Sequence, residues 1–249
     1  MVQANQEKTD RLQDTDQPEY SSSVKKTALI FGGNGLVGEQ LVRLLLKDPR
    51  YGTIKVFGRH RPDIPYGNFD FYSVDPLKPG EYVTELEGDD IFVCLGTTIK
   101  KAKTKENFRK VDFQMPVEIA QTGLQNGANN FLVVSSIGAD AKRKNFYLRT
   151  KGEMEEAVKQ FKFRKIAILR PSMLLGKRKE FRLGEVVGKI LMQLVGYMLW
   201  GGLRKYRGIQ ARDVALSMIE IANQSFKEVV FPSDKLADIA RKVKGERRI

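Results

Sequence analysis

Two residues spaced for acid–base chemistry stand near the middle of the chain. Tyr147 and Lys151 are four positions apart in a run that predicts a helix over Phe146–Phe161, so they share one helix face. A tyrosine has an ordinary pKa of about 10, and a neighbouring ammonium favours its ionised form, which lets the phenol exchange protons nearer neutral pH. Ser136, which ends a predicted strand, could hold a substrate carbonyl while Tyr147 passes its proton, with Ser135 as the alternative.

A Tyr-x-x-x-Lys spacing often arises by chance, so Tyr147 and Lys151 alone do not indicate a catalytic site. A glycine-rich turn nearer the amino end supports the functional interpretation. The apolar run 28–31 leads into Gly32, Gly35 and Gly38, and an amphipathic helix follows over Leu36–Lys47. Glycines there allow a tight turn, a close approach of the main chain to a pyrophosphate, and close helix packing. The helix N-terminus then points at the phosphates. Strand, turn and helix together predict a dinucleotide-binding site.

The residues that follow the predicted strands Thr53–Phe57 and Phe69–Val74 indicate whether the dinucleotide is NAD or NADP. Arg59 stands where an acid usually binds the ribose hydroxyls of NAD, and an arginine there can pair with the 2′-phosphate of NADP. We therefore predict NADP(H) rather than NAD(H). His60 and Arg61 rank after Arg59 for this contact, and an ordinary exposed base is the alternative. Asp75 can accept a hydrogen bond from the adenine amino group or cap a turn with Pro76.

Strand-like and helix-like runs alternate along the chain, which favours a parallel sheet because parallel strands need crossover connections. We predict an α/β fold: a Rossmann-like, doubly wound parallel sheet with helices on both faces and a small C-terminal region that covers the substrate. Further strands are predicted at Thr53–Phe57, Phe69–Val74, Asp90–Leu95, Asn130–Val134 and Lys165–Leu169, and a further helix at Lys105–Gln125. Ligands lie beyond the carboxyl ends of such strands, so Gly96 and Thr97 border the cofactor unless they form a plain turn.

Composition bounds the class of protein. The 249 residues, 41% of them hydrophobic, suit one globular domain. Residues 1–25 are predicted to be a disordered acidic tail, since the first 20 carry five acids and two bases, and residues 26–249 the dinucleotide-binding domain. The single Cys94 is expected to be a buried strand residue rather than a catalytic thiol, and no metal site is predicted. Without a long apolar segment or a signal core, we expect a cytoplasmic protein.

The formal net charge of +13 indicates a surface that favours anions. The basic clusters lack interleaved aromatic residues and no nucleic-acid module is recognisable, so nucleic acid is not an expected partner. The apolar stretch Val186–Trp200 is predicted to form a helix that covers a substrate pocket. A protein partner, a second copy of the chain and a peripheral membrane contact are the alternatives for this stretch.

The glycine turn, Ser135-Ser136 and the spacing of Tyr147 and Lys151 resemble the short-chain dehydrogenase/reductase superfamily. The motif Leu95-Gly96-Thr97-Thr98 is similar to its atypical branch around the Tat-interacting protein oxidoreductases, and the resemblance covers about residues 26–223. It implies a Rossmann-like fold, bound NADP(H), Tyr147 as proton donor or acceptor, and Lys151 on the nicotinamide ribose. Further cofactor contacts implied at matching positions are Gly32, Asn34, Gly35, Leu36, Val37, Leu95, Gly96, Thr97, Leu174 and Arg182.

Two functions follow as hypotheses. The first is an NADP(H)-dependent oxidoreductase that transfers hydride to or from a small carbonyl or alcohol substrate through Ser136, Tyr147 and Lys151. The second is a non-catalytic dinucleotide-binding regulatory or scaffold protein, because several relatives in this branch are thought to act as regulators. The resemblance therefore bears more directly on the cofactor than on the reaction.

Overall fold

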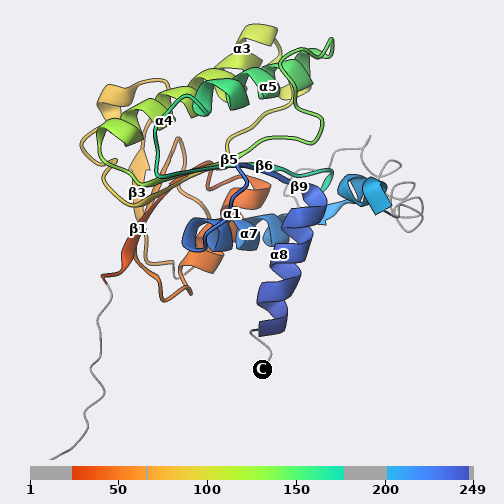
Figure 1. Ribbon diagram of the computed structural model, residues 1–249. Helices are drawn as coiled ribbons and strands as arrows, with labels where there is room; N and C mark the ends of the chain where they lie inside the picture. The colour runs from red at the N-terminus through yellow and green to blue at the C-terminus, as the bar shows by residue number, and fades with distance from the viewer. Residues whose placement is uncertain (1–23, 66, 177–200, 247–249) are drawn as a thin grey trace, which may run out of the picture.

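A computed structural model of the chain describes residues 24–65, 67–176 and 201–246. Within these residues, a seven-stranded sheet in the order β3-β2-β1-β4-β5-β6-β9 forms the centre of the molecule, and every neighbouring pair is parallel (Figure 1). The strands are β1 (Lys26–Phe31), β2 (Tyr51–Gly58), β3 (Asp70–Ser73), β4 (Asp90–Val93), β5 (Asn130–Val134), β6 (Lys165–Arg170) and β9 (Val230–Pro232). This is the doubly wound, Rossmann-like order that the alternation of strands and helices predicts.

Helices cover both faces of the sheet (Figure 1). One face carries α1 (Leu36–Leu45), α7 (Ala211–Asn223) and α8 (Ser233–Glu246), and the other α3 (Lys105–Arg109), α4 (Met115–Gln125) and α5 (Phe146–Val158). Alternate residues of β1 belong to different hydrophobic clusters: Ala28 and Ile30 to the α1 and α7 side, Leu29 and Phe31 to the α4 and α5 side. A strand buried on both faces reads as a continuous apolar run, which explains the sequence of β1.

The predicted helix Lys105–Gln125 is wrong as a single element. It divides into α3, a π-helical turn η2 (Lys110–Gln114) and α4. Pro116 lacks the N–H that would bond to the carbonyl of Asp112, and the N–H of Met115 instead bonds to the carbonyl of Lys110, five residues back. The proline therefore marks the break in an otherwise helical pattern.

Several smaller elements lie near the site and carry no clear periodic signal. The four-residue helix α2 (Ile99–Ala102) follows β4, and a short parallel pair joins β7 (Leu174–Leu175) to β8 (Ile209–Gln210). Short helical turns η1 (Pro79–Glu81) and η3 (Gly201–Tyr206) complete the described elements. Of the helices in the described ranges, none has the length and apolar character needed to cross a bilayer.

Two sequence predictions fall almost wholly outside the described residues. The acidic tail, residues 1–25, has only its last two residues within them, and the apolar stretch Val186–Trp200 lies beyond them, as does Arg182. Both remain predictions.

The first testable expectation concerns Gly38, where α1 begins against the turn after β1. A Cβ atom added there would lie 2.1 Å from the carbonyl oxygen of Gly32. We expect Gly38→Ala to lower the free energy of unfolding by roughly 1–3 kcal/mol, measured by urea denaturation, because overpacking forces the backbone apart. Gly245→Ala in α8, where a Cβ meets nothing within 4 Å, is the control and should cause no loss. Equal stability of the two variants would contradict the close packing of α1.

Candidate functional site

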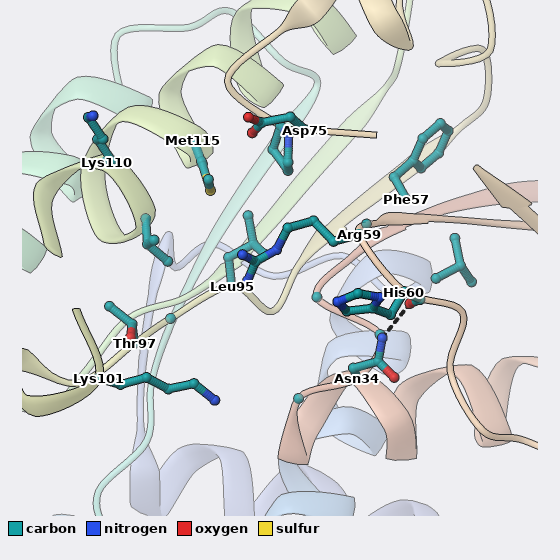
Figure 2. Close-up of a pocket in the computed structure, with 18 of the residues that line it drawn as sticks. Asn34, Phe57, Arg59, His60, Asp75, Leu95, Thr97, Lys101, Lys110 and Met115 are labelled. Carbon is teal, nitrogen blue, oxygen red and sulfur yellow. Dashed lines mark hydrogen bonds between the residues drawn. The ribbon is translucent and has the colours of Figure 1, made fainter. Parts of the chain in front are cut away.

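A cavity of about 900 Å³ lies at the carboxyl ends of β1, β2 and β4 (Figure 2). β1 and β4 are adjacent in the sheet, although the helices that follow them pack on opposite faces. Doubly wound sheets bind ligands at this crossover of the chain. The predicted cofactor residues that line the cavity are Gly32, Asn34, Gly35, Leu36, Arg59, Asp75, Leu95, Gly96 and Thr97.

The floor of the cavity is the glycine turn after β1. Gly32 has φ +88°, and a Cβ atom there would lie 2.7 Å from the carbonyl oxygen of Cys94, so only glycine fits. The N–H of Gly35 donates to the carbonyl of Gly32 at 2.9 Å, and Gly35 precedes α1 without any capping side chain. The backbone N–H groups and positive dipole end of the ten-residue helix α1 are thus left for an anion. The turn fits a diphosphate.

Basic side chains face the cavity from two walls. Arg59 points its guanidinium inward from the end of β2, with His60 beside it, and Lys101 of α2 reaches in from the opposite side (Figure 2). The side chain of Asn34 donates to the carbonyl of His60 at 2.5 Å, which ties the glycine turn to the end of β2. Arg61 lies elsewhere: its guanidinium stacks 4.3 Å from the ring centroid of Phe69. Arg59 and His60 are therefore the bases of this loop that can meet a ligand.

Asp75 lines the cavity and also closes a turn. Its Oδ1 accepts a hydrogen bond from the N–H of Leu77 at 3.1 Å. The carboxylate thus caps the turn that contains Pro76, which is the alternative that the sequence left open. Adenine recognition by Asp75 remains a prediction.

The predicted proton-transfer residues lie behind the loop after β4 rather than in the cavity wall. Lys151 is 3% exposed, and its Nζ lies 2.8 Å from Oδ1 of Asp112. The ring of Tyr147 packs on Phe108 with 5.5 Å between centroids. Gly96 links this region to the cavity, since a Cβ atom there would lie 4.0 Å from Nζ of Lys151.

The charge on Lys151 is strongly favoured. Burial lowers its pKa, but the Asp112 carboxylate, with smaller contributions from Tyr147 and Glu155, outweighs that effect and raises the pKa above its ordinary value. The ammonium therefore carries its positive charge throughout the physiological pH range.

The two candidate serines have different surroundings. Ser135 is buried and its hydroxyl donates to Glu155 at 2.5 Å, while the same carboxylate accepts from Arg170 at 2.5 Å. Ser136 is half-buried, and its hydroxyl makes only a long contact of 3.4 Å, with the carbonyl of Ile137. Of the two, Ser136 is thus the one whose hydroxyl is not held by a buried carboxylate.

Besides Lys151, two of the implied cofactor residues in the described ranges do not line the cavity. Val37 is 4% exposed and its side chain belongs to the hydrophobic core, so only its backbone can meet a ligand. Leu174, in β7, is half-buried and packs against the same core. The cavity brings together the predicted glycine turn and the ends of β2, β3 and β4, and leaves Ser136, Tyr147 and Lys151 outside its wall.

Sequence reasoning missed Asp112 and the cavity-lining Lys101, Lys110 and Met115. The sequence does contain a signal for Asp112. This residue lies four positions after Phe108 and seven before Ile119, on the apolar face of the predicted helix, where burial of an unpaired carboxylate would cost free energy. An acid on a buried face indicates a buried partner.

Comparisons with known proteins agree with this fold. The model of the HIM1 family matches residues 72–195. The chain is 31% identical over 229 residues to the mitochondrial protein FMP52 of Candida albicans, covering 86% of this chain and 98% of FMP52. It is 34% identical over 164 residues to the protein HTATIP2 of Rattus norvegicus, covering 64% of this chain and 67% of HTATIP2. The enzyme WbmG of Bordetella bronchiseptica, solved with NAD, superimposes with a TM-score of 0.62 at 13% identity, covering 92% and 82% of the two chains, which shows a shared fold.

The expectation of a cytoplasmic protein is wrong. The FMP52 relatives from several fungi are named mitochondrial, and they match this chain over most of its length. The prediction rested on the lack of a long apolar segment, a feature that does not report which compartment holds the protein.

The reactivity of the Cys94 thiol tests whether this residue is a buried structural cysteine or a reactive one. It lies one residue beyond the strand and is half-buried, with its Sγ 3.9 Å from Sδ of Met218. Burial raises the pKa of the Cys94 thiol to about 12. At pH 8 we expect the folded protein to react with Ellman's reagent at least about 100-fold more slowly than the protein in guanidinium chloride, because the thiolate is the reactive form. Rapid reaction of one thiol in the folded protein would contradict this assignment.

Proposed function

We propose that this chain, which belongs to the same atypical short-chain dehydrogenase/reductase family as FMP52 and HTATIP2, is an oxidoreductase that binds NADP(H) and acts on a carbonyl or alcohol substrate. The observation that carries the proposal is the cavity at the β1 and β4 crossover, with the glycine turn as its floor and Arg59 pointing into it. A bound nicotinamide supplies the hydride chemistry. The residues of the chain supply binding, orientation and the proton.

Binding is assigned to the glycine turn and the end of β2. The N–H groups at the start of α1 bind the diphosphate, and Arg59 pairs with the 2′-phosphate that distinguishes NADP from NAD. Support comes from the inward orientation of Arg59 and from the fact that no acid occupies its place in the sequence. Asp63, which also lines the cavity, lies four residues farther along the loop.

The preference for NADP is tested by removing one arginine at a time. Arg59→Ala should weaken NADPH binding by about 10-fold or more and leave NADH binding unchanged, because a charge-assisted hydrogen bond to the 2′-phosphate contributes roughly 1.5–3 kcal/mol. Calorimetric titration measures both affinities. Arg61→Ala is the matched control. It also removes one positive charge from this loop, but the Arg61 side chain stacks on Phe69 and does not enter the cavity. Equal losses for NADPH and NADH in Arg59→Ala would contradict the assignment.

Proton transfer is assigned to Tyr147. In carbonyl reduction its hydroxyl donates a proton to the substrate oxygen while the Ser136 hydroxyl orients the same oxygen, and the nearby ammonium of Lys151 stabilises the phenolate that remains. In alcohol oxidation the proton returns to the phenolate. The half-buried position of Tyr147 and the buried, charged state of Lys151 support these roles.

Tyr147→Phe tests this assignment. With a panel of aldehydes, ketones and quinones and NADPH as reductant, we expect kcat to fall by about 100-fold or more, because the phenol donates the proton. NADPH affinity, measured by calorimetry, should be unchanged. Unaltered turnover in the variant would contradict the role of Tyr147. Tight NADPH binding by the wild-type chain with no turnover across the panel would favour the non-catalytic binding protein.

The names of the FMP52 relatives also support a mitochondrial location for this chain. A basic surface, with a net charge of +13, is compatible with anionic substrates and cofactors in that compartment.

A further inference from the structure

The short helix α2 brings a lysine to the side of the cavity opposite Arg59. Lys101 lines the cavity, and Figure 2 shows its side chain directed inward, towards the side that carries α1 and Asn34. Lys100, its neighbour in the same helix, is exposed and is not part of the cavity lining. Because successive residues of a helix point about 100° apart, α2 directs one ammonium to the cavity and the preceding one to solvent.

Hydrogen bonds at both ends of α2 hold it in this orientation. At its start, Oγ1 of Thr98 accepts from the N–H of Lys101 at 3.2 Å. At its end, the side-chain amide of Asn107 donates to the carbonyl of Ala102 at 3.1 Å. Lys103 then turns the chain into α3 with φ +67°, a left-handed conformation that no other non-glycine residue in the described ranges adopts. The caps and this turn together keep Lys101 facing the cavity.

The glycine-turn side of the cavity offers an anion little positive charge. Its described lining residues are 32–36 and Glu39, and the one ionisable side chain among them is an acid. Glu39 lies in the first turn of α1 and pairs with Arg43 at 3.0 Å, in a partly exposed ion pair. A diphosphate carries a negative charge on each phosphate, whereas the start of a helix is equivalent to about half a positive charge. The α1 side therefore leaves much of the charge of a diphosphate unbalanced.

The other basic side chains of the cavity lie elsewhere. Arg59 enters from the end of β2 and is assigned to the 2′-phosphate, and Lys110 belongs to η2. In Figure 2, Lys101 lies on the same side of Arg59 as Asn34, and Lys110 lies on the other side with Met115. Lys101 is thus the lysine of the cavity lining that is placed to face a group on the glycine turn.

We propose that Lys101 binds the diphosphate of the dinucleotide from the wall opposite the glycine turn, so that the diphosphate lies between the start of α1 and the ammonium of α2. The inference rests on the proposed function and adds a second set of contacts to the same ligand. The hydrogen bond from an ammonium to a phosphate oxygen is charge-assisted, and such bonds are about twice as strong as neutral ones. Because NADP and NAD share the diphosphate, Lys101 contributes to the affinity for both, whereas Arg59 contributes to the affinity for NADP alone.

The test is Lys101→Met, which keeps an unbranched side chain and removes the charge. By calorimetric titration, we expect the Kd values of NADPH, NADH and ADP-ribose each to rise about 10-fold, as loss of a charge-assisted hydrogen bond does. Adenosine 2′-phosphate, which has no diphosphate, should bind the variant and the wild type equally. Lys101→Arg retains the charge and should keep all of these Kd values within about 3-fold of the wild type.

Lys100→Met is the matched control. It removes the same charge from the same helix, so it changes the general attraction of the basic surface for anions in the same way, and its Kd values should stay within about 2-fold of the wild type. Equal losses in Lys100→Met and Lys101→Met would overturn the proposal, because the loss would then follow net charge. Unchanged Kd values in Lys101→Met would overturn it too. A loss confined to NADPH would place Lys101 on the 2′-phosphate and would overturn it equally.

ADP-ribose separates this inference from the oxidoreductase function. It carries the diphosphate but neither the nicotinamide nor the 2′-phosphate, so its binding requires no turnover and no preference for NADP. If the wild type binds NADPH but turns over no substrate, the oxidoreductase function fails, and the Kd of ADP-ribose in Lys101→Met still decides the role of Lys101. If the wild type binds none of NADPH, NADH and ADP-ribose, both proposals are wrong.

Discussion

The close approach of the turn after β1 to the end of β4 is the constraint on which the site depends. Gly32, with a positive φ, passes so near the carbonyl of Cys94 that no side chain fits between them. The same turn receives the start of α1, where Gly38 touches the carbonyl of Gly32. With three backbone segments in contact, the space at the carboxyl ends of the strands is left for a ligand, and the helix N-terminus faces it.

Charge is organised differently on the two sides of the loop after β4. In the cavity, the arginine at the end of β2 is exposed and points inward, ready for an anionic ligand. On the other side of the loop, charges are paired: the buried Lys151 with Asp112, and the half-buried Arg170 with the buried Glu155. Thr97 joins the two sides, because it lines the cavity and donates its N–H to Asp112. One carboxylate thus contacts both the loop that lines the cavity and the buried ammonium of Lys151.

Sequence patterns predicted the elements where the signal is local. The apolar runs of β1 and β5 and the glycine turn gave strand and turn positions within a residue or two of those observed. The helix over Lys105–Gln125 was predicted as continuous because its apolar spacing is regular. In the structure it is interrupted by the π-helical turn η2, because Pro116 has no N–H to continue the hydrogen-bond pattern. The distal elements α7, β9 and α8 were not predicted, since their roles depend on packing against strands far away in the chain.

The sequence by itself determined the doubly wound fold and the dinucleotide turn, because both follow from the periodicity and glycine spacing of neighbouring residues. Only the tertiary structure decided which charges meet. It joined Asp112 to Lys151 across 39 positions of the chain, and it turned Arg61 away from the cavity while Arg59 entered it. Such pairings depend on crossover geometry and on the direction of each side chain, and local spacing encodes neither of these.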